Sequence, residues 1–252
     1  MQRYFLDNDP VTEEVELPKE IAHHLITVLR ATPGTKIELV MGNHKVYLAE
    51  LVTIDSVPTA KLIKDLGQDS EMPVKVLLAC GVPKTKEKPE LIVQKGTEMG
   101  ATKIIFFEGE RSVSHWNKQK QEKKIIRLQK IADAAAEQSH RNVKPEVIYL
   151  PSLKELLKAT NGIDYRLVAW EESAKQGEKS ALASTLEEVK SGDSILGIFG
   201  PEGGLSESEV QSMTEKGVIP AGLGPRILRT ETAPLYFLGA VSFATELLGK
   251  RE

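Results

Sequence analysis

Two glycine-rich stretches carry the clearest chemical signal in the sequence. Residues 200–204 (GPEGG) follow one apolar, strand-like run, and residues 222–225 (GLGP) follow another. Glycines let a backbone approach a ligand closely or adopt positive φ angles. A phosphate cradle is disfavoured, because neither stretch has a G-x-G-x-x-G or G-x-x-x-x-G-K-[ST] pattern and Glu202 would repel a phosphate. A cofactor with positive charge and an adenosine part fits better, although each loop alone could be a tight structural turn.

The second stretch leads into a charged run, RILRTETA, that begins at Arg226. Thr230 or Thr232 can cap the helix expected to follow, and Glu231 suits the positive end of its dipole. Arg226 and Arg229 oppose that dipole. Their charge is therefore better explained by a ligand or a polyanion than by the helix.

The elements around these loops predict where they meet. After Pro73, β-branched apolar runs alternate with helical patterns, which is typical of a mainly parallel sheet covered by helices. The predicted strands are 74–80, 103–107, 147–150, 166–170, 194–199 and 218–221. The predicted helices are 88–99, 118–138, 153–160, 181–190, 206–216 and 232–248. Ligands bind such sheets beyond the carboxyl ends of the strands, where both glycine-rich loops fall.

The segment before Pro73 differs in character. Its short strand-like runs at 2–6, 36–40 and 45–54 and its single helical pattern at 20–30 predict a small β-rich module. A chain of 252 residues is long for one compact domain. We therefore expect two domains, residues 1–72 and residues 73–252.

Composition limits the class of protein. Hydrophobic residues make up 40% and charged residues 27% of the chain, as in globular proteins, and no apolar run has the length of a membrane span. The N-terminus lacks a signal-peptide pattern, so we expect a cytoplasmic protein. The single cysteine, Cys80, lies in an apolar run and is expected to be a buried, inert thiol.

Charge is distributed unevenly along the chain. Residues 1–73 carry 7 Lys and Arg against 12 Asp and Glu, residues 74–144 carry 15 against 8, and residues 145–252 carry 11 against 16. A basic middle segment suggests a surface that faces a polyanion. A solvated face on the predicted helix 118–138 explains this charge equally well.

Seven motifs together resemble one known family. They are GPEGGLSESE, LGPRILRTETA, MQRYF, HHLITVLR, IVQKGTEMGATKIIFF, ERSV and AAAEQSHRNVKPEV. They cover nearly the whole chain in the order of one family, and they resemble the RsmE family of ribosomal RNA methyltransferases, within the SPOUT class of S-adenosylmethionine enzymes.

The resemblance implies a fold and a reaction. It implies methylation of N3 of one uridine in 16S ribosomal RNA of the small subunit, a homodimer and no metal. It also implies a PUA-like N-terminal β-barrel that binds RNA and an α/β SPOUT domain with a deep trefoil knot. Periodicity alone predicts an unknotted sheet, because knotted chains are rare.

The resemblance also implies a binding site for S-adenosylmethionine, built from the loops 198–204 and 223–232 and the end of a neighbouring strand. The expected cofactor-binding residues are Trp170, Glu171, Ile198, Phe199, Gly200, Glu202, Gly203, Leu223, Gly224, Ile227, Leu228, Thr232 and Ala233.

Methylation of N3 requires loss of its proton and places negative charge on the flanking carbonyl oxygens, which an arginine would stabilise. Arg229 is the first candidate, supported by Arg226, Thr230 and Gln138. Glu231 and Glu202 are candidates for the general base, and the sequence does not choose between them.

RNA contacts are expected mainly from the basic segment. Five positions match the family: Arg3, Arg30, Arg111, Arg141 and Asn142. Lys120, Lys123 and Lys124 add positive charge.

Two other classes of protein were weighed. A dinucleotide-dependent oxidoreductase would share the sheet, but the glycine fingerprint is missing. An RNA-binding protein without catalysis fits the basic segment, but leaves the two glycine-rich loops without a purpose.

Overall fold

The computed structural model describes residues 1–54, 57–170 and 181–248, and the chain divides into two compact units. The N-terminal unit comprises Met1–Glu71 and Ala136–Val143, and the C-terminal unit comprises Met72–Ala135 and Lys144–Glu252. The sequence predicted one division near residue 72. The structure differs in one respect, because Ala136–Val143 packs with the N-terminal unit.

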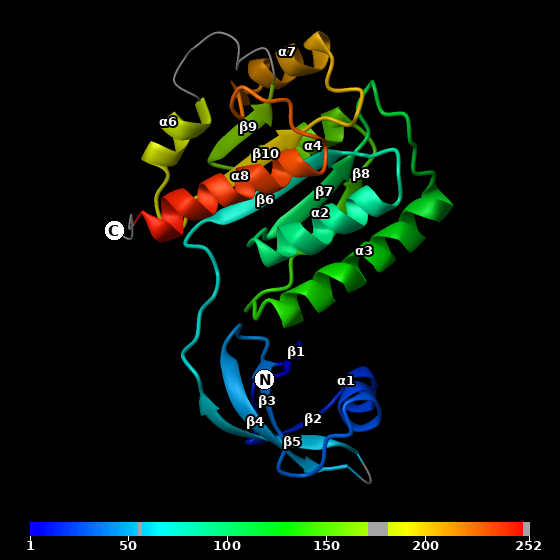
Figure 1. Ribbon diagram of the computed structural model, residues 1–252, viewed down its shortest axis with the longest axis vertical. Helices are drawn as coiled ribbons and strands as arrows, with labels where there is room; N and C mark the ends of the chain where they lie inside the picture. Colours follow the sequence, from blue (N-terminus) through cyan, green and yellow to red (C-terminus); the bar gives the residue numbers. More distant parts are fainter. Residues whose placement is uncertain (55–56, 171–180, 249–252) are drawn as a thin grey trace. The chain divides into compact units, whose positions relative to one another are not determined.

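The N-terminal unit is built on a curved five-stranded sheet with the strand order β1-β3-β4-β5-β2 (Figure 1). Its strands are β1 (Arg3–Phe5), β2 (Glu14–Glu16), β3 (Lys36–Val40), β4 (Val46–Thr53) and β5 (Thr59–Asp65). A short helix α1 (Lys19–His23) continues into a π-helical turn (His24–Val28). Two register shifts between β4 and β5 increase the twist, which helps the sheet curve into a half-barrel around its apolar side chains.

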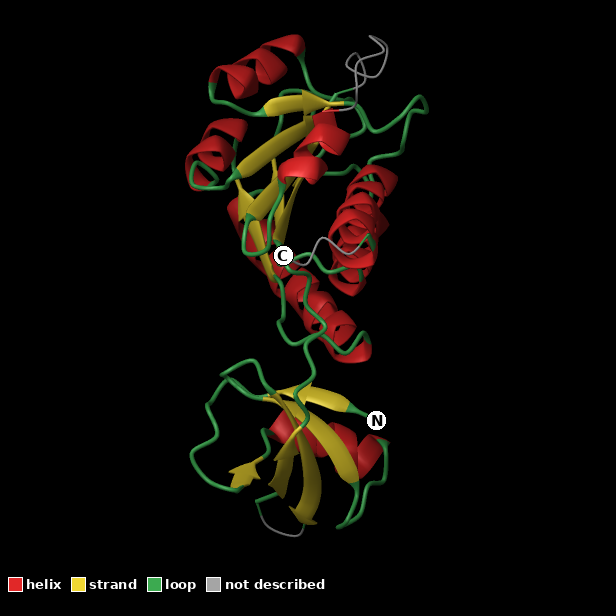
Figure 2. Ribbon diagram, turned by 90° about the vertical axis from the view of Figure 1, so that its left-hand side faces the viewer, coloured by secondary structure: helices red, strands yellow, loops and turns green. Residues whose placement is uncertain are grey.

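The C-terminal unit contains a six-stranded parallel sheet with the order β11-β9-β10-β6-β7-β8. Its strands are β6 (Lys75–Gly81), β7 (Lys103–Phe107), β8 (Glu146–Leu150), β9 (Tyr165–Ala169), β10 (Ser194–Phe199) and β11 (Ile219–Ala221). Figure 2 shows helices on both sides of this sheet. A parallel sheet covered on both faces explains why its strands are almost continuously apolar.

Each face of the C-terminal sheet has its own core. One face is covered by α2 (Glu87–Glu98), α3 (Lys118–Gln138), α6 (Ala181–Glu188) and α8 (Thr232–Ser242). The other is covered by α4 (Leu153–Ala159) and α7 (Glu207–Glu215). Helix α8 approaches β10 closely, since a Cβ atom at Gly197 would lie 2.9 Å from a ring carbon of Phe237.

The expected α/β fold with a small β-rich N-terminal module is confirmed, and the trefoil knot stays a prediction. Strands β2 and β5 were not predicted, because their mostly exposed and charged residues lack an apolar run. The predicted helix 232–248 ends earlier, since α8 gives way to a π-helical turn (Phe243–Leu247). Among the described helices, none is long and apolar enough to span a membrane.

Candidate active site

The two central strands of the C-terminal sheet, β6 and β10, end beside each other. Cys80 pairs with Phe199 at this edge. The chain continues from β6 to β7 on one side of the sheet and from β10 to β11 on the other, so the two connections run in opposite directions. This is the topological switch point at which parallel sheets bind ligands. Burial raises the pKa of the Cys80 thiol, as expected for an inert side chain.

The glycine-rich loop after β10 packs closely against two neighbouring segments. A Cβ atom at Gly81 would lie 2.5 Å from the backbone nitrogen of Pro201, so the chain after β6 touches the loop. A Cβ atom at Gly203 would lie 2.8 Å from the carbonyl oxygen of Arg111. The Arg111 guanidinium donates a hydrogen bond of 3.2 Å to the Leu205 carbonyl. These contacts fix the path of the loop.

The predicted helix start after this loop is confirmed. Ser206 Oγ accepts a hydrogen bond from the Glu209 N–H (3.1 Å), and the Glu209 carboxylate accepts one from the Ser206 N–H (2.8 Å). This reciprocal capping box begins α7. Glu209 also accepts the Glu110 N–H at 2.9 Å, which joins the loop after β7 to the same helix start.

A single lysine contacts both predicted cofactor loops. Lys88 Nζ, in the first turn of α2, donates to Glu202 Oε1 at 2.9 Å and lies 3.2 Å from Glu231 Oε2. Glu202 belongs to the loop after β10, whereas Glu231 directly precedes α8. The two loops, distant in sequence, are therefore close in space.

The electrostatics of this contact favour the charged forms. Burial alone would raise the pKa of Glu202, but the Lys88 ammonium and backbone N–H groups, including that of Lys84, outweigh it and hold the pKa below its usual range. The Glu202 carboxylate, followed by Glu231, raises the pKa of Lys88 despite an opposing effect of burial. Lys88 therefore stays an ammonium and Glu202 a carboxylate at neutral pH.

A positive φ angle and two backbone hydrogen bonds determine the path of the loop before α8. Gly224 has a φ of +94°, a conformation that favours glycine. The N–H groups of Thr232 and Ala233 both donate to the Arg229 carbonyl, at 2.8 and 3.0 Å. The predicted cap by Thr230 or Thr232 is wrong, because Glu231 occupies the N-cap position and makes no side-chain capping bond.

Comparisons with known proteins agree with this geometry. Residues 70–242 match the model of an RNA methyltransferase domain, and residues 17–56 match that of an RNA methyltransferase PUA domain. The chain belongs to the RNA methyltransferase family. It is 43% identical to the ribosomal RNA small subunit methyltransferase E of Bacillus subtilis, with 98% of each chain covered.

Solved structures similar to this methyltransferase have the same fold. A ribosomal RNA small subunit methyltransferase E from Neisseria gonorrhoeae, bound to S-adenosyl methionine, has a TM-score of 0.80 and 30% identity over 96% of this chain and 97% of that one. The structure of a hypothetical protein has a TM-score of 0.90 and 38% identity over 98% and 100%. The resemblance to the RsmE family is confirmed.

Most of the expected cofactor residues of this methyltransferase lie on the loops joined by Lys88. Ile198 and Phe199 are the buried end of β10, and the Trp170 N–H at the end of β9 donates to the Ala221 carbonyl at 3.0 Å. Glu171 lies outside the described residues. The loop residues are Gly200, Glu202, Gly203, Leu223, Gly224, Ile227 and Leu228, with Thr232 and Ala233 at the start of α8.

The candidate catalytic residues fall into two groups. Arg226, Arg229 and Thr230 lie on the loop before α8, and the two arginine side chains are exposed. Within the described part of the chain, neither guanidinium has a hydrogen bond or an ion pair. Gln138 is exposed at the end of α3 and belongs to the N-terminal unit. No cluster of three metal-ligating side chains occurs among the described residues.

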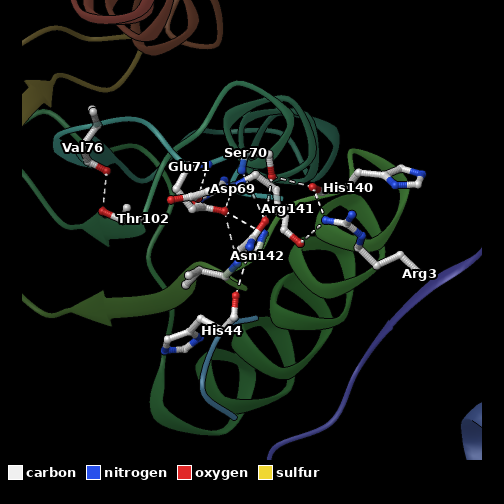
Figure 3. A network of polar contacts seen from close by, with 11 residues as sticks. Arg3, His44, Asp69, Ser70, Glu71, Val76, Thr102, His140, Arg141 and Asn142 are labelled. Atoms are coloured by element: carbon white, nitrogen blue, oxygen red, sulfur yellow. Dashed lines mark hydrogen bonds and ion pairs between the residues drawn. The ribbon is translucent and has the colours of Figure 1, made fainter. Parts of the chain in front are cut away.

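Three of the expected RNA-binding side chains are instead buried in a polar network of the N-terminal unit (Figure 3). Arg3 Nε donates to Glu38 at 2.9 Å, and Arg141 Nε donates to Glu71 at 2.8 Å. The Asn142 amide donates to two carbonyls, those of His44 (3.0 Å) and Gln68 (2.8 Å). These donors are used within the N-terminal unit, and the expected contact of the three side chains with RNA stays a prediction.

Three of the remaining expected RNA contacts, Arg30, Arg111 and Lys123, are exposed. Arg30 is exposed with a φ of 54°, and Lys123 is exposed on α3. Lys124 Nζ lies 4.5 Å from the centre of the Trp116 ring. Lys120 lies on α3, and its side chain is outside the description. Arg111 is exposed but contributes one hydrogen bond to the glycine-rich loop.

Sequence reasoning missed Lys88 and Gly81. Gly81 is the last residue of β6, and Lys88 lies in the first turn of α2. A charge pattern could have indicated Lys88. Each glycine-rich loop carries a carboxylate that a cation would stabilise. A lysine in the first turn of a helix is unfavourable for the helix dipole, as Arg226 is before α8, so its charge is better explained by such a partner.

Proposed function

We propose that this methyltransferase transfers the methyl group of S-adenosylmethionine to N3 of one uridine in 16S ribosomal RNA. The observation that carries the proposal is the contact of Lys88 with Glu202 and Glu231, which unites two glycine-containing loops at the switch point of a parallel sheet. The relatives named ribosomal RNA small subunit methyltransferase E support the choice of RNA.

The residues at these loops suit this cofactor. A Cβ atom at Gly203 would lie 2.8 Å from the Arg111 carbonyl oxygen, and one at Gly200 would make tight contacts from 3.0 Å, so both positions favour glycine. Ile227 is 79% exposed and offers an apolar contact for an adenine ring, with Leu228 beside it. Bound S-adenosylmethionine supplies an activated methyl group on a positively charged sulfur.

Arg229 is proposed to act on the uracil ring. Its exposed guanidinium is free to donate to the carbonyl oxygens that gain negative charge as N3 loses its proton. Arg226, Thr230 and Gln138 would orient the nucleotide. Glu202 is disfavoured as the general base, because its lowered pKa makes its carboxylate a weaker proton acceptor.

RNA phosphates are proposed to contact Arg30, Lys120, Lys123 and Lys124. Of these, Arg30 and Lys123 have exposed side chains, as long-range attraction of a polyanion requires. The matched PUA model supports an RNA-binding role for the N-terminal unit.

A homodimer is also part of the proposal. Apolar side chains are exposed in α8, in the following π-helical turn and directly after it: Tyr236 (43%), Phe243 (54%), Leu247 (73%) and Leu248 (61%). Such a patch marks an interface. The protein is proposed to act on the small ribosomal subunit in the cytoplasm.

Methyl transfer to small ribosomal subunits tests the proposal. Subunits from a strain that lacks the enzyme would be incubated with the protein and S-adenosylmethionine, followed by primer extension on the 16S RNA. A methyl group on N3 blocks base pairing, so one new strong stop is expected. Calorimetry should show binding of S-adenosylhomocysteine and not of NAD. Absence of the stop, or binding of NAD alone, would refute the proposal.

A further inference from the structure

A cavity lies in the C-terminal unit, outside the two glycine-rich loops. It measures about 540 Å³ and is bordered by the start of α2, the segment 114–116 and the first half of α3. Its lining residues are Lys86, Pro89, Glu90, Ser114, His115, Trp116, Lys123, Lys124, Arg127 and Leu128. None of them belongs to the loops that Lys88 joins.

The lining of this cavity is rich in positive charge. Four cationic side chains face one carboxylate, that of Glu90. Arg127 pairs with this carboxylate through two contacts, at 2.9 and 3.1 Å, so the acceptor is already used. The cavity therefore has many donors and few acceptors, which suits an anion.

Trp116 supplies an independent sign of a ligand. Its side chain is 96% buried, since only 4% of the residue is exposed, and its ring stacks on Tyr149 at 5.6 Å. The indole Nε1 is buried and has no hydrogen-bond partner within the described residues. Buried N–H groups are nearly always paired, so this donor calls for an acceptor that the described residues do not provide.

Hydrogen bonds to Glu108 hold the segment of the cavity wall that carries Trp116. Glu108 accepts the Trp116 backbone N–H at 2.9 Å and the Tyr149 hydroxyl at 2.5 Å, and its other oxygen lies 2.9 Å from His115 Nδ1. Burial alone would raise the pKa of Glu108, but these hydrogen bonds outweigh burial and lower the pKa. The carboxylate thus stays charged and holds both the Trp116 backbone and Tyr149, whose ring stacks on the indole.

We propose that this cavity binds one phosphate-bearing nucleotide of the RNA substrate, outside the methyl-transfer site. The inference rests on the proposed function and adds a second point of RNA recognition. A bare phosphate would leave most of the volume empty, whereas a nucleotide fits the range of small-ligand sites. Lys86 lines the cavity only two residues before Lys88, so one RNA strand could reach both sites.

Indole NMR tests the site directly. The chain has two tryptophans, so protein labelled with ¹⁵N-tryptophan gives two indole N–H signals, and Trp116→Phe identifies one of them. Uridine 5′-monophosphate and a 16S RNA transcript should each shift the Trp116 signal, and uridine should shift it far less. An unmoved Trp116 signal at saturating transcript would overturn the proposal. Tighter binding of the free nucleotide than of the transcript would contradict RNA as its source.

Two variants extend the test to affinity. Trp116→Phe keeps the aromatic ring and removes the donor, and Lys86→Gln removes charge at an exposed position. Each should weaken binding of the transcript about tenfold and leave S-adenosylhomocysteine binding unchanged. Lys130→Gln is the matched control, because Lys130 is exposed on α3 and does not line the cavity.

The outcome separates this inference from the proposed function. If the parent methylates the 16S RNA but both variants bind it as the Lys130→Gln control does, the cavity is not a nucleotide site. If the parent neither methylates the RNA nor binds S-adenosylhomocysteine, the proposed function itself fails.

Discussion

Lys88 Nζ lies 2.9 Å from Glu202 Oε1, across 114 positions of the chain. The same ammonium reaches Glu231 at 3.2 Å, which makes α2 the element that joins the two cofactor loops. Helix α8 follows Glu231 and packs against α2, β6 and β10. The loop after β11 must therefore pass the ends of β9 and β10 before α8 begins.

Replacement of this lysine should disturb cofactor binding. Lys88→Met leaves two carboxylates facing each other without a cation, so the loops should separate. We expect affinity for S-adenosylhomocysteine to fall about tenfold, equivalent to about 1.4 kcal/mol, in calorimetry. Lys84→Met is the control, because Lys84 contacts Glu202 only through its backbone N–H. Equal affinity in the two variants would show that the bridge does not organise the site.

The bridge also predicts a pH dependence. The pKa of Glu202 in the folded protein lies below the usual 4.5. The stabilising effect of its carboxylate is therefore complete above pH 4.5, and it is lost as the pH falls through the folded-state pKa. The pKa of Lys88 is raised above 10.5, so its effect is complete below that value and lost at higher pH. Affinity for S-adenosylhomocysteine should stay flat from about pH 6 to 9. A steep change inside that range would mean that another group controls binding.

Close packing at the end of β6 leads to a third prediction. Gly81→Ala would place a Cβ atom 2.5 Å from both the nitrogen and Cδ of Pro201. Because backbone must move to relieve this clash, we expect a loss of about 1 to 3 kcal/mol in the free energy of unfolding and weaker cofactor binding. Gly162→Ala should be neutral, since nothing lies within 4 Å of its added Cβ atom. Denaturant titration compares them, and equal stability would contradict the packing argument.

The polar network of the N-terminal unit should matter for stability. Arg141 and Glu71 form a largely buried pair, so Arg141→Met leaves a carboxylate with fewer donors. Removal of one partner from a buried pair costs about 3 to 5 kcal/mol. The exposed pair of Lys61 and Glu13 is the control, and Lys61→Met should cost less than about 1 kcal/mol. A change in RNA affinity without any loss of stability would support Arg141 as an RNA contact.

Arg229 should separate catalysis from cofactor binding. Arg229→Ala removes the donor proposed to stabilise negative charge on the uracil carbonyls, so turnover should fall about 100-fold or more. Affinity for S-adenosylhomocysteine should change little, because the Arg229 backbone carbonyl still accepts the Thr232 and Ala233 N–H groups. Turnover equal to that of the parent in single-turnover methylation would refute this role.

The sequence predicted the C-terminal sheet well because its strands are buried on both faces. Lys103–Phe107 and Ser194–Phe199 were predicted with their exact limits, and so was α3. Strand β5 was missed because it lies in a sheet with an exposed side, where Lys61, Ile63 and Lys64 give no clear apolar pattern.

The site was predicted less completely. Glycine patterns and family resemblance located both loops, but contacts such as Lys88 with Glu202 depend on tertiary packing that local sequence does not encode. The burial of Arg3, Arg141 and Asn142 was also not predicted. An arginine has the same residue type whether it binds phosphate or a buried carboxylate, and only the fold distinguishes the two roles.

Hydrogen exchange measured by mass spectrometry, with and without S-adenosylhomocysteine, tests the central claim most directly. If the two loops form one cofactor site, peptides covering 198–205 and 222–233 should become protected together, at the same ligand concentration. Peptides from the N-terminal sheet should not change. Protection of one loop without the other, or of neither, would contradict a shared site.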